Sequence, residues 1–172
     1  MKCDIKANNN LVIEDAKIIF RNFTGRASKF NAAGNRNFCT IVDKETGEKL
    51  RDLGWNVRIL APRDDDDEPT YYIPVAVGFG YYPPNITLIT NKSRVNLTEE
   101  TISSLDYAEV ANVDLILRPY NWEVNGNHGI KAYLKTMYVV LEEDDFAEKY
   151  ASAGSAGVTE EPYHTDEPLP FA

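Results

Sequence analysis

The clearest alternation of apolar and polar positions lies between residues 112 and 142, where two long runs flank the segment Asn-Gly-Asn-His-Gly at 125–129. An Asn-Gly pair between β-branched and aromatic runs is a strong hairpin signal, so the runs are predicted to form two long antiparallel strands. Side chains alternate between the faces of a strand. The first strand therefore has one face with Val113, Leu115 and Leu117 and another with Arg118, Tyr120 and Trp122. On the second strand, Ala132, Leu134 and Thr136 share one face, and Lys131, Tyr133 and Lys135 share the other.

The length of the hairpin loop decides which faces of the two strands coincide. A loop of about two or four residues pairs even positions with odd ones and brings the two aromatic and basic faces together. A four-residue loop would set Trp122 opposite Lys131, Tyr120 opposite Tyr133 and Arg118 opposite Lys135, whereas an odd loop length would mix the faces. Like charges directly opposite each other are destabilising, so a face of rings and cations without an acid suits a bound anion. Single-stranded nucleic acid is held in this way, by stacking and phosphate contacts. The alternative is a solvated face whose Lys and Arg stems cover the rings.

The rest of the chain up to this hairpin predicts further strands and little helix. Strands are expected at residues 11–23, 36–42, 55–61, 70–79 and 85–90, with Pro74 placing its strand at an edge or a bulge. Short helices are expected at 46–53 and from Thr98 onward. Short strands without a βαβ rhythm indicate an all-β barrel or sandwich, and the economical form is an OB-fold-like Greek-key barrel of about five to seven strands.

The composition changes after the hairpin. Residues 151–157 are Ala, Ser and Gly only, which is typical of a flexible linker. Residues 160–172 are acidic, rich in proline and poor in apolar residues, so we expect them to be disordered. The predicted organisation is one domain at 1–145 followed by a linker and acidic tail at 146–172. The tail ends in a small apolar group behind negative charge, which suits docking into a basic-rimmed pocket of a partner protein.

The formal net charge of −9 argues against a nucleic-acid ligand until its location is considered. From residue 142 on there are nine acidic residues and one basic residue, which leaves eighteen acidic and seventeen basic residues for 1–141. Five of those acids are consecutive at 64–68, so the remaining body carries thirteen acids and seventeen bases. A binding surface needs a local positive field rather than a positive total, and this body provides one.

Several classes of protein are disfavoured by what the sequence lacks. No run of eighteen apolar residues and no signal peptide is present, and Cys3 and Cys39 make no disulfide framework, so a cytoplasmic location is expected. His128 and His164 have no partner at catalytic or metal-ligand spacing, and the acids at 64–68 lack the spacing of a calcium loop. We therefore expect no enzyme, no metal and no cofactor. A structural or adaptor β-barrel remains the alternative to a nucleic-acid binder.

The chain resembles bacteriophage single-stranded DNA-binding proteins. The resemblance rests on the segments at 18–25 (IIFRNFTG), 29–38 (KFNAAGNRNF) and 54–57 (GWNV), and on the acidic tip at the end of the tail. The tip is formed by Asp166, Glu167, Pro168, Leu169, Pro170 and Phe171. This resemblance implies an OB-fold, sequence-independent protection of single-stranded DNA in replication, recombination and repair, and recruitment of replication or repair proteins by the tip. The chain departs from the family in having Ala172 after Phe171, which moves the terminal carboxylate away from the phenyl ring.

Two groups of residues are the candidate DNA contacts. The first is the hairpin face with Arg118, Tyr120, Trp122, Lys131, Tyr133 and Lys135, and the second is the loop group of Lys29, Phe30 and Arg36. Phe30 could instead anchor the loop in the core, and Phe38 and Trp55 fit the core better than a DNA surface. Tyr71, Tyr72, Tyr81 and Tyr82 could extend the stacking surface or be ordinary tyrosines of a sheet edge. Arg58, Lys92 and Arg94 are single charges and fit solvated surface better than a DNA contact. The choice between DNA and RNA and the formation of a homo-oligomer stay open.

Overall fold

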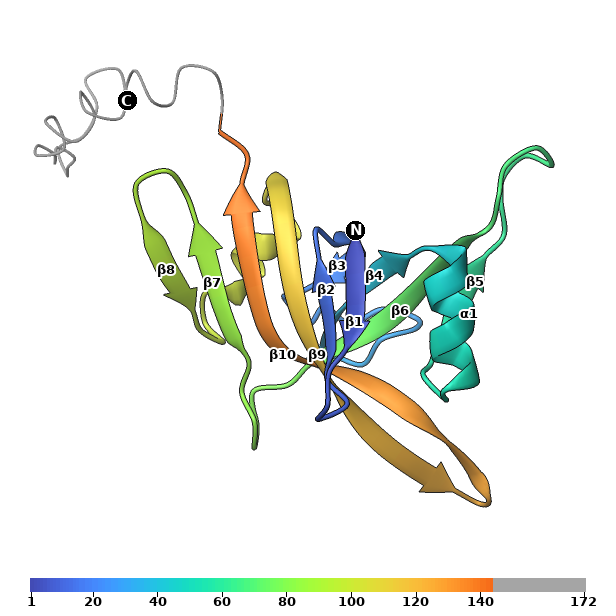
Figure 1. The fold of residues 1–172 in the computed structure, drawn as a ribbon. Coiled ribbons are helices and arrows are strands. Elements are labelled where there is room, and N and C mark those ends of the chain that lie inside the picture. The colour runs from blue at the N-terminus through green and yellow to red at the C-terminus, as the bar shows by residue number, and fades with distance from the viewer. Residues whose placement is uncertain (144–172) are drawn as a thin grey trace, which may run out of the picture.

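The computed structural model describes residues 1–143 and is mostly β-structure in that part of the chain (Figure 1). The strands are β1 (Lys2–Ile5), β2 (Leu11–Glu14), β3 (Lys17–Asn22), β4 (Arg36–Val42), β5 (Arg58–Leu60), β6 (Thr70–Val77), β7 (Asn85–Ile89), β8 (Arg94–Leu97), β9 (Val110–Val124) and β10 (Asn127–Leu141). The helices are α1 (Lys44–Asp52) and the short 3-10 helix η1 (Ile102–Asp106). The predicted all-β class, the long hairpin and the short helix near residue 46 are confirmed. The short strands β1 and β8 were not predicted.

All ten strands belong to one sheet whose main pairing order is β1-β2-β9-β10-β6-β4-β3. The hairpin β9–β10 lies in the middle of this order, and β10 changes its second partner along its length. It pairs in parallel with β6 at Ala132 and Tyr133 and with β7 from Thr136 to Val140. Before Ala132, the two hairpin strands leave the body of the molecule as a two-stranded arm (Figure 1).

The sheet curves strongly but does not close by strand pairing. The predicted single strand at 11–23 is wrong, because Asp15, at φ 57°, separates β2 from β3. β2 pairs with β9 on one side of this bend, and β3 pairs with β4 on the other. The Ala16 amide donates to the Val113 carbonyl at 2.7 Å, and the Asp15 amide donates to Oδ1 of Asp114 at 2.8 Å. One bent segment thus connects the two ends of the curved sheet, which gives the OB-fold-like shape.

The core lies inside this curved sheet and follows the predicted alternation up to a bulge. Val113, Leu115 and Leu117 are buried, as are Ala132 and Leu134. The hairpin register shifts between Leu134 and Thr136, and a β-bulge moves later side chains to the other face. Met137 and Val139 therefore occupy the buried face, and the prediction that Thr136 shares the face of Leu134 is wrong.

Pro74 was predicted to mark an edge or a bulge, and it lies in an interior strand at a point where one side has no partner. On one side β6 pairs with β4 throughout Tyr71–Val77, and on the other β5 pairs up to Tyr72 and β10 begins at Val75. Pro74 falls in the interval between these two partners, where β6 has no ladder on that side. The predicted strand at 55–61 is shorter than expected and begins at Arg58.

Two sequence-based expectations concern residues outside the described part. The domain end at 145, the linker and the acidic tail at 146–172 all fall beyond residue 143. Within residues 1–143, no helix is long and apolar enough to cross a membrane.

Candidate nucleic-acid interface

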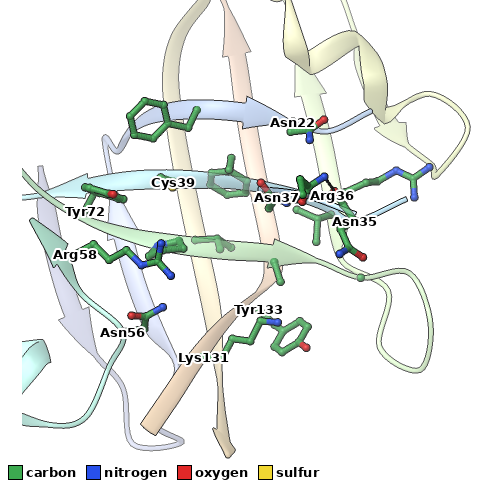
Figure 2. A pocket seen from close by; sticks show the side chains of 18 of the residues that line it. Asn22, Asn35, Arg36, Asn37, Cys39, Asn56, Arg58, Tyr72, Lys131 and Tyr133 are labelled. Carbon is green, nitrogen blue, oxygen red and sulfur yellow. Dashed lines mark hydrogen bonds between the residues drawn. The ribbon is translucent and has the colours of Figure 1, made fainter. Parts of the chain in front are cut away.

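A groove of about 1620 Å³ is lined by residues of β4, β6 and the outer part of the hairpin (Figure 2). We call this hollow the groove. Its aromatic lining consists of Phe20, Phe30, Phe38, Trp55, Tyr72, Phe79, Trp122 and Tyr133. Its cationic lining consists of Arg36, Arg58 and Lys131, and Glu99 is the one acidic side chain that the described part of the chain contributes. Rings and cations in an open channel form the combination that accommodates a flexible polyanion with stacking bases.

The hairpin turn is a two-residue loop formed by Asn125 and Gly126. Asn125 and Gly126 have φ angles of 53° and 84°, and Val124 pairs directly with Asn127. Positive φ at both central residues is the requirement of a type I′ turn, which Asn-Gly satisfies. The predicted pairing of even with odd positions is confirmed. The partners are those of a two-residue loop: Trp122 opposite Gly129, Tyr120 opposite Lys131 and Arg118 opposite Tyr133.

Trp122 lies across the opposing strand on a glycine. A Cβ atom added to Gly129 would come within 3.0–3.1 Å of three atoms of the Trp122 indole. The indole therefore packs against bare backbone, which only glycine provides at this close approach. Trp122 is 37% exposed and lines the groove, so the arm presents it to a ligand in a supported position.

Tyr133 is the centre of the cationic and aromatic cluster on the hairpin. Its ring centroid lies 5.4 Å from Cζ of Arg118 and 5.2 Å from Nζ of Lys131, within the range of cation–π attraction. Tyr120 meets it edge to face with the centroids 5.8 Å apart. Arg118 also lies 4.9 Å from the ring of Tyr82. These contacts hold the cations beside the rings without neutralising their charge.

The arm is fixed to the body at Ile130. Its amide donates to the Gly54 carbonyl at 2.8 Å, and its carbonyl accepts from the Asn56 amide at 3.0 Å. The chain after α1 thus forms a short parallel bridge with β10, in which Trp55 pairs with Ile130. Among residues 1–143, the parts of β9 and β10 beyond this bridge pair only with each other.

The loop at residues 23–35 forms one wall of the groove and is held by amide groups. Oδ1 of Asn22 accepts from the amides of Gly25 and Arg26 at 3.0 and 2.9 Å. Nδ2 of Asn31 donates to the carbonyls of Arg26, Ala32 and Asn35 at 2.8–3.2 Å. The two ends of the loop meet where the Gly34 amide donates to the Gly25 carbonyl. A Cβ atom added to Gly25 would lie 3.1 Å from the backbone of Gly34. These asparagines keep the loop in shape and leave Phe30 at its tip 90% exposed.

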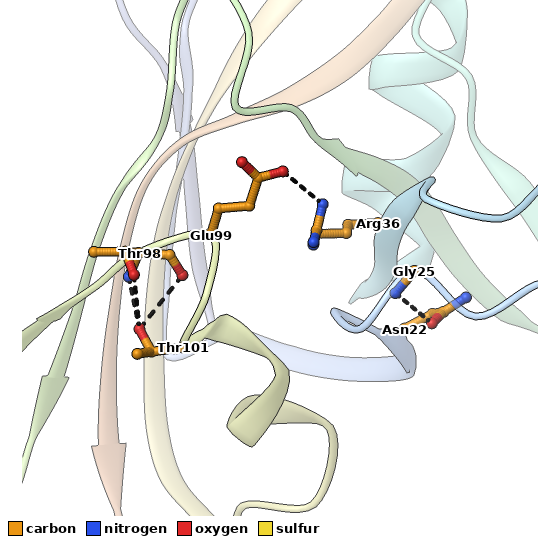
Figure 3. Close-up of polar contacts among 6 residues, drawn as sticks. All are labelled: Asn22, Gly25, Arg36, Thr98, Glu99 and Thr101. Carbon is orange, nitrogen blue, oxygen red and sulfur yellow. Dashed lines mark hydrogen bonds and ion pairs between the residues drawn. The ribbon is translucent and has the colours of Figure 1, made fainter.

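Arg36 enters the groove at the start of β4 and meets Glu99 from the segment before η1 (Figure 3). Its Nη1 donates to Oε2 of Glu99 at 3.0 Å, and its Cζ lies 5.8 Å from the ring of Phe79. The turn that carries Glu99 is fixed by the Thr98 amide, which donates to Oγ1 of Thr101 at 2.8 Å. Nε of Arg36 is buried and has no acceptor among the described residues.

The groove floor is neutral at its centre. Burial raises the pKa of the Cys39 thiol to about 11, and the nearby Arg58 only partly opposes this effect. The thiol is thus uncharged at physiological pH and adds no negative charge next to the arginine. The positive charge of the groove lies on Arg36, Arg58 and Lys131.

The structure distributes the sequence-predicted contact residues unequally. Trp122, Lys131, Tyr133, Phe30 and Arg36 all line the groove. Arg118 and Tyr120 lie beside it through their contacts with Tyr133. Lys29 and Lys135 do not line the groove. Lys29 lies next to Phe30. Lys135 falls at the bulge of β10, where it has no partner on β9, and Arg118 is opposite Tyr133 instead.

The exposure of Phe30, Phe38, Trp55 and Phe20 decides the remaining expectations about the groove. The alternative that Phe30 is a buried anchor is wrong, since its ring is exposed. Phe38 and Trp55 are 0% and 5% exposed, in agreement with their expected core role. Regular alternation within the expected strand would put Phe20 on the face of Ile18, but Phe20 is 58% exposed on the groove. No sequence signal identified Phe20, because its turn outward depends on a positive φ that strand patterns do not encode.

Comparison with known proteins gives one family and one fold. Residues 2–163 match the family described as "Putative phage ssDNA-binding domain". Two similar solved structures are of the single-stranded DNA-binding protein from bacteriophage Enc34. The structure in complex with ssDNA has a TM-score of 0.53 at 10% identity, over 84% of this chain and 93% of that chain. The other has a TM-score of 0.53 at 9% identity, over 86% and 93%. None of the curated proteins matches the sequence.

Proposed function

This chain belongs to the family of phage single-stranded DNA-binding domains, and on that premise we propose that the groove is where it holds the strand. The binding is independent of sequence, and it serves phage DNA replication, recombination and repair. The expected footprint is on the order of 4–16 nucleotides. A binding family of this kind agrees with the expectation of a protein without catalytic activity.

One observation carries the assignment to the groove. A single hollow gathers five of the nine sequence-predicted contact residues together with further rings and Arg58. Bases stack on rings of any identity, because every base has a π face, and cations follow the phosphates. The hairpin cations lie against rings rather than against acids, so they remain available to phosphate.

The acidic tip at 166–171 extends this proposal to protein partners. Negative charge followed by Pro-Leu-Pro-Phe suits a basic-rimmed apolar pocket on a replication or repair protein. This part of the proposal rests on the sequence alone. Phe171→Ala removes the apolar anchor and keeps the acids, so it should weaken such docking without changing the affinity for DNA.

The ligand class is tested by titrating the full chain with single-stranded DNA, single-stranded RNA and duplex DNA of matched length and label. We expect single-stranded DNA to bind more tightly than duplex. Equal affinity for duplex and single strand would indicate a general polyanion surface. Tighter binding of single-stranded RNA than of single-stranded DNA would show that RNA is the ligand. The absence of binding to all three would leave a structural or adaptor barrel.

The groove is tested by Trp122→Ala, which should weaken single-strand binding by roughly 1–3 kcal/mol, the usual worth of a base–aromatic stack. Tyr138→Ala is the matched control, since Tyr138 is 41% exposed on β10 but does not line the groove. Lys131→Ala should instead lower the slope of log affinity against log salt by about 0.7, for one lost phosphate contact. Parent-like binding by Trp122→Ala and Lys131→Ala would place the DNA elsewhere.

A further inference from the structure

Phe20 combines a strained backbone with an exposed ring. Its φ is 52°, a region that bulky residues rarely adopt and that costs free energy. The register of β3 with β4 shifts between Ile19 and Asn22, so the irregular backbone is confined to Phe20 and Arg21. Regular alternation would have placed Phe20 on the face of Ile18, which packs against the core. The strain thus moves an apolar ring out of the core and onto the groove.

The exposed ring of Phe20 has an aromatic neighbour and a cation beside it. Its centroid lies 5.8 Å from that of Tyr72 on β6, with the rings edge to face. Tyr72 is the register partner of Arg58 on β5, and all three side chains line the groove. Figure 2 shows Tyr72 and Arg58 at the end of the groove opposite Arg36.

The distance between the Arg36 end and the Tyr72 end of the groove suits an extended DNA strand. Tyr72 on β6 is opposite Ile41 on β4, and Arg36 is the first residue of β4. Five residues of β4, or roughly 17 Å, therefore separate Arg36 from the position of Tyr72. The Trp122 ring on the arm and the Tyr133 ring at the base of the arm line other parts of the same groove. A strand held only at the arm would leave the Tyr72 end empty.

We propose that Phe20 and Tyr72, with Arg58 as the phosphate contact, form a second base-stacking subsite at this end of the groove. This inference rests on the proposed function and adds to it a path for the strand from the arm to the Phe20 end. Glycine or asparagine would satisfy the backbone at φ 52° with less strain. The phenyl ring is explained by a base that covers it when the strand is bound.

The test uses Phe20→Ala, Phe20→Gly and Tyr72→Leu in the full chain, with Tyr138→Ala as the exposed-aromatic control. Affinity for a single-stranded oligonucleotide of about 16 nucleotides and the number of nucleotides covered are both measured. Each of the three variants should lose roughly 5- to 100-fold in affinity and cover fewer nucleotides. Phe20→Gly should melt at a higher temperature than Phe20→Ala, because glycine has no steric penalty at this φ.

The comparison with Trp122→Ala separates the two levels of the proposal. If Trp122→Ala loses affinity while Phe20→Gly and Tyr72→Leu keep the parent's affinity and footprint, the second subsite is wrong and the groove stands. If all these variants bind like the parent, the groove itself is wrong. Two separate subsites also require that the losses of Trp122→Ala and Phe20→Ala add in the double variant. A double variant no weaker than the single variants would contradict a second subsite.

Discussion

Among the described residues, Glu99 has the one carboxylate that lines the groove, and this carboxylate accepts a hydrogen bond from the guanidinium of Arg36. The side chains are 52% and 21% exposed, so solvent screens the pair, and an exposed ion pair of this kind is worth about 0.2–1 kcal/mol. A phosphate that binds Arg36 must displace the carboxylate or share the guanidinium with it. In the proposed binding mode, Glu99 of the unbound protein therefore occupies the place where a phosphate would contact Arg36.

Glu99→Gln should strengthen single-strand binding at low salt, up to roughly fivefold. It should also steepen the salt dependence by about 0.7 in the log–log slope, because Arg36 then exchanges a solvent ion for a phosphate. Titrations at several salt concentrations measure both quantities. Weaker binding by Glu99→Gln would mean that the carboxylate positions Arg36 for the strand and does not compete with it. Arg36→Ala should weaken binding in either case.

At the scale of the element, helix α1 is held at its start by Asp43. Oδ1 of Asp43 accepts from the Thr46 amide at 2.7 Å, and this bond is the main reason why the pKa of Asp43 lies below its ordinary value. The bond satisfies one of the free amides of the first helical turn. A lowered folded-state pKa means that the stabilisation is present above the unfolded pKa of about 3.9 and is lost as pH falls through the folded value.

Asp43→Ala should lower the free energy of unfolding by about 1 kcal/mol at neutral pH. The difference from the parent should shrink in acid below pH of about 4, as the parent's carboxylate is protonated. Urea unfolding at several pH values measures it. Asp43→Asn is the control, since its amide oxygen keeps an acceptor at the cap but does not titrate. A difference between parent and Asp43→Ala that does not depend on pH would show that the charge has no part in the capping.

Elements with many alternating residues were predictable from the sequence, and short or irregular ones were not. The hairpin has fifteen residues in each strand and a turn that only a few dipeptides satisfy, so its pattern was unambiguous. β1 and β8 have four residues each and are mostly exposed, so they show no apolar face. The bulge after Leu134 and the positive φ of Phe20 depend on tertiary packing. These irregularities are why Lys135 was placed in the site and Phe20 was left out.

At the scale of the whole molecule, charge is divided between the two parts of the chain. Residues 144–172 carry seven acidic residues and one basic residue. Negative charge that is covalently attached to a DNA-binding domain is a competing anion at high effective concentration, and we infer this role for residues 144–172. The core described within residues 1–143 is continuous without this segment.

Deletion of residues 144–172 should therefore tighten binding of single-stranded DNA, most at low salt, where the Debye length is longest. The melting temperature should change little. A full-length variant with the seven acids changed to Asn or Gln is the matched control and should tighten binding as the deletion does. Tighter binding by the deletion alone would mean that the segment acts through its bulk and not through its charge. A markedly lower melting temperature would show that it belongs to the fold.

The bridge between Ile130 and the Gly54–Asn56 segment divides the hairpin into parts that differ in how readily they open. Toward the core, the amides of β10 lie between two partner strands, whereas beyond Ile130 the arm pairs only with itself. Local opening takes least free energy where such support is absent. Amide hydrogen exchange should thus be slow at Ala132 and Leu134 and fast near Asn127, with the change at Ile130. Bound DNA should slow exchange in the arm and leave the inner part unchanged, so the arm itself would report the occupancy of the groove.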